Sequence, residues 1–528
     1  MLLFAMVRTA YRGWRGQRPN VEDMERIVGY IRDRRARGLS ALPFGASGWV
    51  RSGFRHWCGY GPQAKAQGSA APQSRAGSLS DGQSGASTGF SRHKASVPGR
   101  SQAIQGRALR RTVEYVYRYV PFYRETMDAK GVRPGDIRSL ADVTKLPITY
   151  REQLADRPHD FISTYPGLVP AVRSWTSGTT RRPVVLYLTN EELRYYAALR
   201  ALGSLTSGSL GPTDILQLHQ SVDDSTAGII TAQAARLAGT LVLTWGDKGS
   251  LDEHLESIFQ ERHVPGKKTK VTALITSPSH LWALTHRAVE KGLDCRESGL
   301  RWISTGGAMV SDDLKQRVLD TWGIRLSEHY GLVEAVTAGA RPCSRSSRLH
   351  FSDLSAYAEA LHPEMVEPVP PGGPGILVIT TFYPYRELMP LVRYWTGDLV
   401  RLSPDPVCVC GARTTQILDI LGRADHMVTI GMYNYYPQQI GDPLVVMKEL
   451  VQPPRFTLRT EMDESTQRAI LEVEVAKTLS DGEQQKLRTR IERAVILSSH
   501  WEVAAGSVAL DVRLRPAGHI ERPFPYKR

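Results

Sequence analysis

Short apolar runs alternate with longer segments of helical periodicity between residues 184 and 291. Runs of about four to eight residues suit strands, whereas longer segments with apolar residues every three or four positions are typical of helices. We expect strands at 184–188, 214–218, 240–244 and 271–276, and helices at 190–202, 227–238 and 279–291. Such alternation is typical of βαβ units, whose mixed or parallel sheets bind ligands at the strand ends. It predicts an α/β fold.

The chain is long enough for two or more domains, because 528 residues with 41% hydrophobic content can bury a large core. An amphipathic helix is expected at 108–127. Beyond residue 423 the pattern indicates a smaller α+β unit. Its expected elements are strands near 455–459, 470–475 and 508–514 and a helix at 481–495.

The positive charge is concentrated in residues 1–104. This segment holds 16 Lys and Arg against 5 Asp and Glu, a net charge of +11 out of the total of +14, which leaves +3 for residues 105–528. The globular part is therefore not expected to bind nucleic acid. Residues 21–37 have helical spacing, but residues 59–104 are rich in Gly, Ser, Ala and Gln. We expect residues 1–104 to be a basic, largely disordered extension that is dispensable for folding.

Targeting signals and cysteine usage favour a cytoplasmic protein. The apolar start at 1–6 is too short for a signal peptide, and a membrane span is not expected because no run of about 18 apolar residues occurs. A basic transit-like peptide and a start codon chosen too far upstream remain alternatives. The five cysteines are an odd number, which argues against a disulfide framework and for a reducing compartment.

A loop dense in hydroxyl groups follows residue 173. Its side chains surround Gly178, whose missing Cβ lets backbone amides approach an anion while the hydroxyls donate to its oxygens. The hydroxyl residues are Ser174, Thr176, Ser177, Thr179 and Thr180. This composition predicts a phosphate-binding loop, although Ser, Thr and Gly are also common in ordinary surface loops.

Further motifs follow in a fixed order. They are Ser-Thr-Gly-Gly-Ala at 304–308, Glu-His-Tyr-Gly-Leu-Val-Glu at 328–334, Arg-Tyr-Trp-Thr-Gly-Asp at 393–398 and Gly-Arg-Ala-Asp-His-Met at 422–427. Together with Val-Pro-Phe-Tyr-Arg at 120–124 and the stretch at 131–147, this series resembles the adenylate-forming enzymes. Within them it is similar to the phenylacetate-CoA ligase and CapK-like branch, from about residue 105 to the end.

The resemblance implies a large multi-sheet N-terminal AMP-binding domain at 105–424 and a small, mobile α+β C-terminal domain at 425–528. It also implies the residues that bind ATP and Mg²⁺. The loop at 174–180 would hold pyrophosphate, with Thr179 among the catalytic residues, and Glu334 would ligate Mg²⁺ through a carboxylate oxygen. Tyr330, beside Gly331, would pack on adenine, and Asp398 would accept both ribose hydroxyls.

The remaining nucleotide contacts implied by the resemblance involve small residues and one arginine. Gly306, Gly307 and Ala308 would form the wall where adenine and the acyl group approach the backbone, and Arg423 would contact ribose or phosphate. A strand end with a buried Tyr and a surface Glu is the structural alternative at 330–334. A Thr-Gly-Asp turn is by itself common turn chemistry.

Several positions depart from the family pattern. Arg181 stands where Gly is common, and Val333 where Ser or Thr is common. Gly431 and Met432 stand where a basic residue and Gly are usual. This last departure puts transfer to CoA in more doubt than adenylation. Near the C-terminus, Lys527 is the candidate for the lysine that neutralises the α-phosphate. His519 is the second candidate.

Three cysteines and one histidine form a possible ligand set for structural Zn²⁺: Cys343, His350, Cys408 and Cys410. Three thiolates and one imidazole are a closed tetrahedral set of the kind that structural zinc prefers. The alternative is a group of ordinary thiols beside a core histidine.

We therefore expect ATP-dependent activation of a small carboxylic acid, with aromatic acids among the candidates, and transfer of the acyl group to CoA. Transfer to carrier-protein phosphopantetheine, to an amine or to a hydroxyl is one alternative. A catalytically degenerate homologue that binds nucleotide is another. A homodimer is left open.

Overall fold

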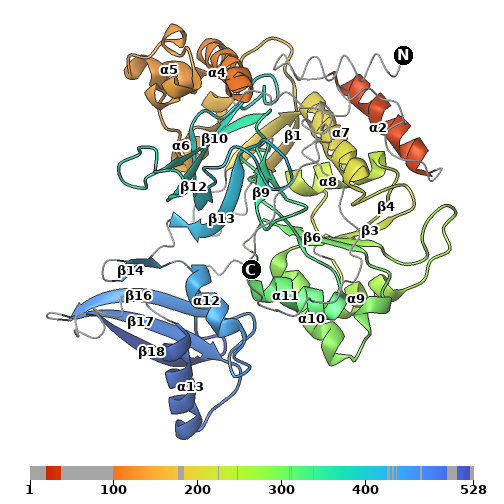
Figure 1. Cartoon of the computed structure of the whole chain (residues 1–528), viewed down its shortest axis with the longest axis vertical. Coiled ribbons are helices and arrows are strands. Elements are labelled where there is room, and N and C mark those ends of the chain that lie inside the picture. Colours follow the sequence, from red (N-terminus) through yellow and green to blue (C-terminus); the bar gives the residue numbers. More distant parts are fainter. Residues whose placement is uncertain are drawn as a thin grey trace, which may run out of the picture.

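The computed structural model describes most of the chain (Figure 1). The described residues are 20–36, 99–175, 184–223, 225–246, 248–307, 310, 312–336, 338–424, 428–430, 433–435, 437–463, 466–495, 508–521 and 523. Seven of the expected site residues lie outside them: Thr176, Ser177, Gly178, Thr179, Thr180, Ala308 and Lys527.

A five-stranded parallel sheet with the order β4-β3-β5-β6-β7 confirms the predicted βαβ alternation. Its strands are β3 (Ile215–Leu218), β4 (Leu241–Thr244), β5 (Ala273–Thr276), β6 (Trp302–Gly306) and β7 (Ser327–His329). The helices between them are α8 (Thr226–Leu237), α9 (Leu251–Phe259), α10 (Pro278–Glu290) and α11 (Asp312–Trp322). Strands β3 and β5 are buried at every position, as expected for a parallel sheet covered by helices.

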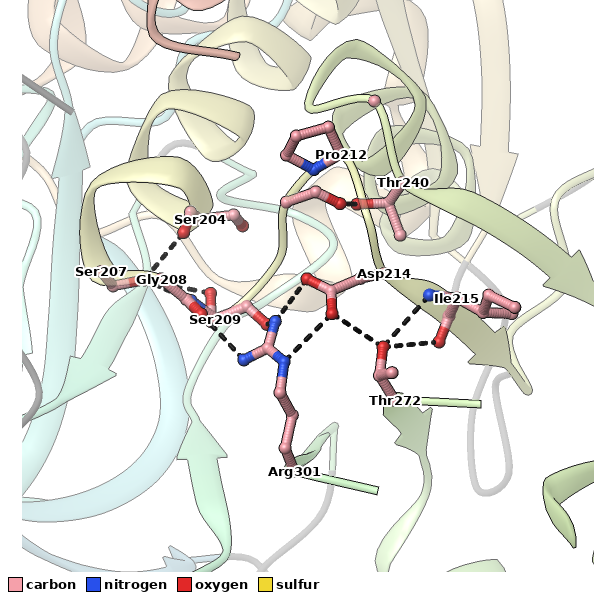
Figure 2. Close-up of polar contacts among 12 residues, drawn as sticks. Ser204, Ser207, Gly208, Ser209, Pro212, Asp214, Ile215, Thr240, Thr272 and Arg301 are labelled. Atoms are coloured by element: carbon pink, nitrogen blue, oxygen red, sulfur yellow. Dashed lines mark hydrogen bonds and ion pairs between the residues drawn. The ribbon is translucent and has the colours of Figure 1, made fainter. Parts of the chain in front are cut away.

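The amino ends of three of these strands are linked through the carboxylate of Asp214 (Figure 2). Arg301, just before β6, forms a bidentate ion pair with Asp214, just before β3, and donates to the carbonyls of Gly208 and Ser209 at 2.9 Å each. The Thr272 hydroxyl, just before β5, donates to the same carboxylate at 2.9 Å. These bonds fix the amino edge of the sheet and leave its carboxyl edge for ligands.

A six-stranded antiparallel sheet, ordered β10-β11-β12-β13-β9-β8, lies beside the parallel one. Its strands are β8 (Ala340–Pro342), β9 (Leu349–Phe351), β10 (Ala356–Leu361), β11 (Pro374–Thr381), β12 (Tyr394–Leu402) and β13 (Gln416–Arg423). A backbone bridge between Tyr330 and Ala340 joins the end of β7 to β8. The carboxyl edge of the parallel sheet therefore meets the antiparallel sheet.

Helices and a short hairpin complete the large unit. They are α4 (Gly99–Tyr119), α5 (Pro121–Ala129), α6 (Arg151–Asp156), α7 (Asn190–Ser207), the hairpin of β1 (Pro170–Trp175) and β2 (Val185–Thr189), and the 3₁₀ turns η1 (Pro134–Asp136), η2 (Leu140–Lys145), η3 (Pro158–Phe161) and η4 (Cys295–Glu297). The single helix expected at 108–127 is wrong in one respect. It divides at Val120, which is extended, because Pro121 cannot donate a helical hydrogen bond and instead begins α5.

The C-terminal unit is a separate α+β layer, as predicted. It contains β14 (Val428–Ile430), β15 (Tyr433–Tyr435), α12 (Pro437–Val445), β16 (Phe456–Asp463), β17 (Thr466–Val475), α13 (Asp481–Ala494) and β18 (Val508–Pro516). Strand β17 pairs antiparallel with β16 and parallel with β18. The unit has a hydrophobic core of its own, centred on residues such as Phe456, Leu471 and Ile491. Its boundary with the large unit at residues 424 and 425 stays a prediction.

Helix α2 (Val21–Ala36) confirms the helical spacing at 21–37, but it is not peripheral. Met24, Ile27 and Ile31 are fully buried against α7 and α8, and Glu25 pairs with Arg194 of α7 at 2.8 Å. The description of residues 1–104 as largely disordered does not hold for α2, whose apolar face supplies part of the core. That these residues are dispensable for folding stays a prediction, and the packing of α2 argues against it. No helix among the described residues is both long and apolar enough to cross a membrane.

Candidate functional site

Tyr330 and Asp398 meet where the two sheets join. The Tyr330 hydroxyl, one residue beyond β7, donates to Oδ2 of Asp398 in β12 at 2.7 Å. The Asp398 amide donates to the Thr396 hydroxyl at 3.0 Å, which holds the turn before the carboxylate. Burial raises the pKa of Tyr330 well above its ordinary value, and the charge of Asp398 raises it further. The phenol therefore stays a neutral donor to the Asp398 carboxylate.

Arg423 approaches the same carboxylate from β13. Its Nη1 lies 3.5 Å from Oδ1 of Asp398, which is paired with Arg423 in the β12–β13 register. Gly397 makes this approach possible: a Cβ there would lie 2.8 Å from Nη2 of Arg423, and its φ of 76° is in the left-handed region. The structure thus brings together three of the expected nucleotide contacts, Tyr330, Asp398 and Arg423.

Glu334 is buried rather than exposed. Its carboxylate forms an ion pair with Arg151, the first residue of α6, and accepts from the Tyr394 hydroxyl at 3.4 Å. Burial raises the pKa of Tyr394 well above its ordinary value, and the Glu334 charge adds to this shift. The alternative of a surface Glu at this position is therefore wrong. The carboxylate that would bind a cation is therefore already paired with Arg151, a partner 183 residues away that the sequence did not indicate.

Gly306 and Gly307 lie at the carboxyl end of β6 as expected. Gly306 is opposite His329 in the β6–β7 register, and a Cβ at Gly306 would lie 2.9 Å from the His329 carbonyl oxygen. Gly307 has a φ of 81°. Ser304 and His329 are 3.0 Å apart through Oγ and Nδ1, and burial lowers the pKa of His329 to about 3. His329 was given no role in the sequence analysis although it lies inside the 328–334 motif.

The positions of Ser174 and Gly331 give less support to the expected nucleotide site. Ser174 is fully buried in β1, and its hydroxyl accepts from the Thr226 amide at 3.3 Å, so it fastens β1 to the start of α8. Gly331 is exposed, and a Cβ there would meet no atom within 4 Å. The phosphate contacts of the rest of the loop stay predictions, since residues 176–180 lie outside the described chain.

The four expected zinc ligands converge. Sγ of Cys343 lies 3.6 Å from Sγ of Cys408, and Sγ of Cys410 lies 3.3 Å from Nε2 of His350, with all four ligand atoms within 4.8 Å of one another. Two sulfurs bound tetrahedrally at about 2.3 Å lie about 3.8 Å apart, so the spacing suits zinc and exceeds the roughly 2.05 Å of a disulfide. Nδ1 of His350 is 2.8 Å from the Thr414 hydroxyl, which orients the ring. These contacts fit zinc better than a group of unrelated thiols.

Several known proteins are similar to this chain in sequence or in fold. No family model matches the chain. The phenylacetate-coenzyme A ligase of Thermus thermophilus is 29% identical over 378 residues, which cover 71% of this chain and 82% of that protein. The phenylacetate-coenzyme A ligase of Escherichia coli is 29% identical over 360 residues, 66% of this chain and 77% of that protein. The chain is a homologue of the phenylacetate-CoA ligases of the adenylate-forming superfamily.

A solved structure supports the fold of this phenylacetate-CoA ligase homologue. The 2-hydroxyisobutyryl-CoA ligase, in the postadenylation state in complex with 2-HIB-AMP, superposes with a TM-score of 0.66 at 21% identity, covering 80% of this chain and 87% of that one. The homologue therefore has the superfamily's fold, with a large N-terminal and a small C-terminal part.

Proposed function

We propose that the protein is an AMP-forming acid–thiol ligase. A carboxylate oxygen of a small acid would attack the α-phosphorus of ATP, giving an acyl adenylate and releasing pyrophosphate. The sulfur of CoA would then attack the acyl carbonyl, giving an acyl-CoA and releasing AMP. The observation that carries the proposal is the convergence of Tyr330, Asp398 and Arg423 at the carboxyl edge of the parallel sheet. This edge is where open α/β sheets bind nucleotides.

Asp398 would accept the ribose hydroxyls of ATP. Its two carboxylate oxygens already face one donor each, Tyr330 on Oδ2 and Arg423 on Oδ1, so the group is oriented before the ligand arrives. Preorganised charge of this kind contributes more to binding than a carboxylate that must first be ordered. Arg423 would balance the negative charge that Asp398 and the phosphates bring together.

Glu334 would hold Mg²⁺, which supplies charge neutralisation at the polyphosphate when bound. The residue type fits because a hard cation prefers carboxylate oxygen. Arg151 occupies the same carboxylate in the described chain and keeps the buried charge paired. We infer that Arg151 and the cation compete for Glu334.

The Cys343, His350, Cys408 and Cys410 cluster would hold structural zinc. All four positions come from the protein, which leaves none for a substrate. The cluster joins the β8–β9 hairpin to the loop between β12 and β13. Strand β12 contains Asp398. Zinc here would stabilise the sheet that positions the ribose contact.

Acid-dependent exchange of labelled pyrophosphate into ATP tests the proposal. Exchange should appear with one member of a panel of small aliphatic and aromatic acids, and thioester should form when CoA is added. Thioester on a carrier protein, or an amide or ester product, in place of acyl-CoA would change the acceptor but keep the adenylation step. No exchange with any acid would leave a degenerate nucleotide-binding homologue as the better explanation.

A further inference from the structure

Three histidines from three separate elements meet beside the parallel sheet. His219 directly follows β3, His254 lies in α9, and His280 lies in the first turn of α10. One ring nitrogen of each lies within 4.8 Å of those of the other two, and Nδ1 of His254 is 3.0 Å from Nε2 of His280. Helices α9 and α10 pack together below the sheet in Figure 1. We call this group the histidine cluster.

The surroundings of His254 fix which of its nitrogens can bind a cation. Its Nε2 lies 2.6 Å from the carbonyl oxygen of Lys248, which accepts only from a protonated nitrogen. Nδ1 therefore carries the lone pair and faces His280. Metal-bound histidines commonly donate their second ring N–H to a backbone carbonyl in this way. Trp245 packs edge-on against the ring, and Gly249 leaves the space for it.

His219 has a nitrogen that the protein does not satisfy. Its Nε2 accepts from Nε2 of Gln217 at 2.9 Å, whereas its Nδ1 is buried and has no hydrogen-bond partner within the described part of the chain. A metal on Nδ1 requires the ring proton on Nε2 and the Gln217 amide turned so that its oxygen accepts from it. The Gln217 amide oxygen is also buried without such a partner. Buried polar atoms are normally paired, so these orphan atoms mark a place where a ligand would supply what the protein lacks.

We propose that the histidine cluster is a second metal site, which takes one divalent transition-metal ion of borderline softness such as Zn²⁺ or Co²⁺ on His219, His254 and His280. Two nitrogens bound tetrahedrally at about 2.1 Å lie about 3.4 Å apart. The 3.0 Å between His254 and His280 is close to this value, and no spacing in the cluster exceeds 4.8 Å. Imidazole nitrogen selects such ions over Mg²⁺ and Ca²⁺. Three protein ligands leave a fourth position for water or a carboxylate.

This site is distinct from the cysteine-containing cluster and from the proposed nucleotide contacts. It lies at the carboxyl ends of β3 and β5, and β6, which carries Gly306 and Gly307, is the next strand in the sheet. The inference stands on the three side chains alone and does not depend on the proposed ligase activity.

Cobalt binding to the chelator-stripped, full-length protein tests it. In the wild-type protein, Co²⁺ at the histidine cluster should give weak visible d–d bands. Co²⁺ bound by Cys343, Cys408 and Cys410 should give a strong thiolate-to-cobalt band in the near ultraviolet, which distinguishes that site. His280→Gln should bind one cobalt fewer, or bind it at least about a hundredfold more weakly, while keeping the thiolate band. His286→Gln is the matched control, since His286 lies on the same helix with its side chain 54% exposed.

His219→Asn provides a second route if His280→Gln fails to fold, because His219 belongs to a different element. Loss of one cobalt equivalent in either folded variant, with His286→Gln unchanged, supports the site. Equal cobalt stoichiometry and affinity in wild type, His280→Gln and His219→Asn would overturn it. Cobalt that binds the cluster of the wild type only at millimolar concentration would overturn it as well.

Discussion

Tyr330 donates a 2.7 Å hydrogen bond to Asp398, which lies 68 residues further along the chain. The bond joins the end of the parallel sheet to the middle of the antiparallel one, and Arg423 reaches the same carboxylate from the neighbouring strand. Two residues that the sequence assigns to different parts of ATP are therefore in contact with each other. Ribose would enter a group of side chains that is already ordered.

Asp398→Ala should lower kcat/KM for ATP by roughly a hundredfold or more, because both acceptors for the ribose hydroxyls are lost. Tyr330→Phe removes only a donor to that carboxylate, and a net hydrogen bond of about 1 kcal/mol corresponds to about a fivefold change. Pyrophosphate exchange measured against ATP concentration checks both. Tyr165→Phe, at an exposed tyrosine, is the control. An Asp398→Ala enzyme with wild-type kcat/KM would remove Asp398 from the site.

Arg151→Met should reduce the Mg²⁺ concentration needed for half-maximal exchange, since the guanidinium no longer competes for Glu334. The same change should lower the melting temperature of the ligand-free protein, because a buried carboxylate is left without its counter-ion. Arg157→Met breaks the exposed Arg157–Glu125 pair and should change neither quantity. An unchanged Mg²⁺ dependence in Arg151→Met would contradict the competition.

Cys408→Ser should release the zinc bound with Cys343, His350 and Cys410 and lower the melting temperature, with a smaller effect on the chemical step of any protein that stays folded. Elemental analysis and thermal unfolding measure the two effects. Cys295→Ser is the control because Cys295 is buried in another part of the core, away from the cluster. Full zinc content in Cys408→Ser would show that Cys408 is not a ligand.

Met24→Ala and Ile31→Ala should each lower the free energy of unfolding by about 2–4 kcal/mol, because each empties a fully buried position between α2 and α7. Glu22→Ala, at an exposed position of the same helix, should have little effect. Chemical denaturation provides the measurement. If Met24→Ala and Ile31→Ala are as stable as Glu22→Ala, α2 does not contribute to the core and the original expectation for residues 1–104 holds.

The secondary structure was predictable because its signals are local. Apolar runs predicted β3 and β5, and helical spacing predicted α2 and α13, each to within a few residues of the observed bounds. Both signals are read from consecutive residues, because strands and helices repeat every two and every 3.6 residues. The break at Pro121 is also a local signal, and it was missed because the amphipathic pattern continues across it. The packing of α2 against the core was missed because the prediction for residues 1–104 gave more weight to their net charge than to the apolar face of this helix.

The candidate site was predictable only where motifs carried it. Asp398 and Tyr330 were chosen from the motif series, but their mutual contact depends on the meeting of two sheets. The Arg151–Glu334 pair and the histidine cluster join residues that are distant in sequence, with no common motif. Such pairings arise from tertiary structure, so neither periodicity nor spacing indicates them.

The final prediction concerns the C-terminal end and separates the two half-reactions. Lys527→Ala should slow adenylate formation strongly, because the ammonium would neutralise charge that develops on the α-phosphate, while synthetic acyl adenylate and CoA should still react. His519→Ala should be nearly silent: His519 is exposed and its amide closes a turn to Pro516 at 3.2 Å, a contact that the substitution keeps. Single-turnover assays of each step measure the difference. Damage from His519→Ala with a harmless Lys527→Ala would transfer the role to His519 and show that the C-terminal register is wrong.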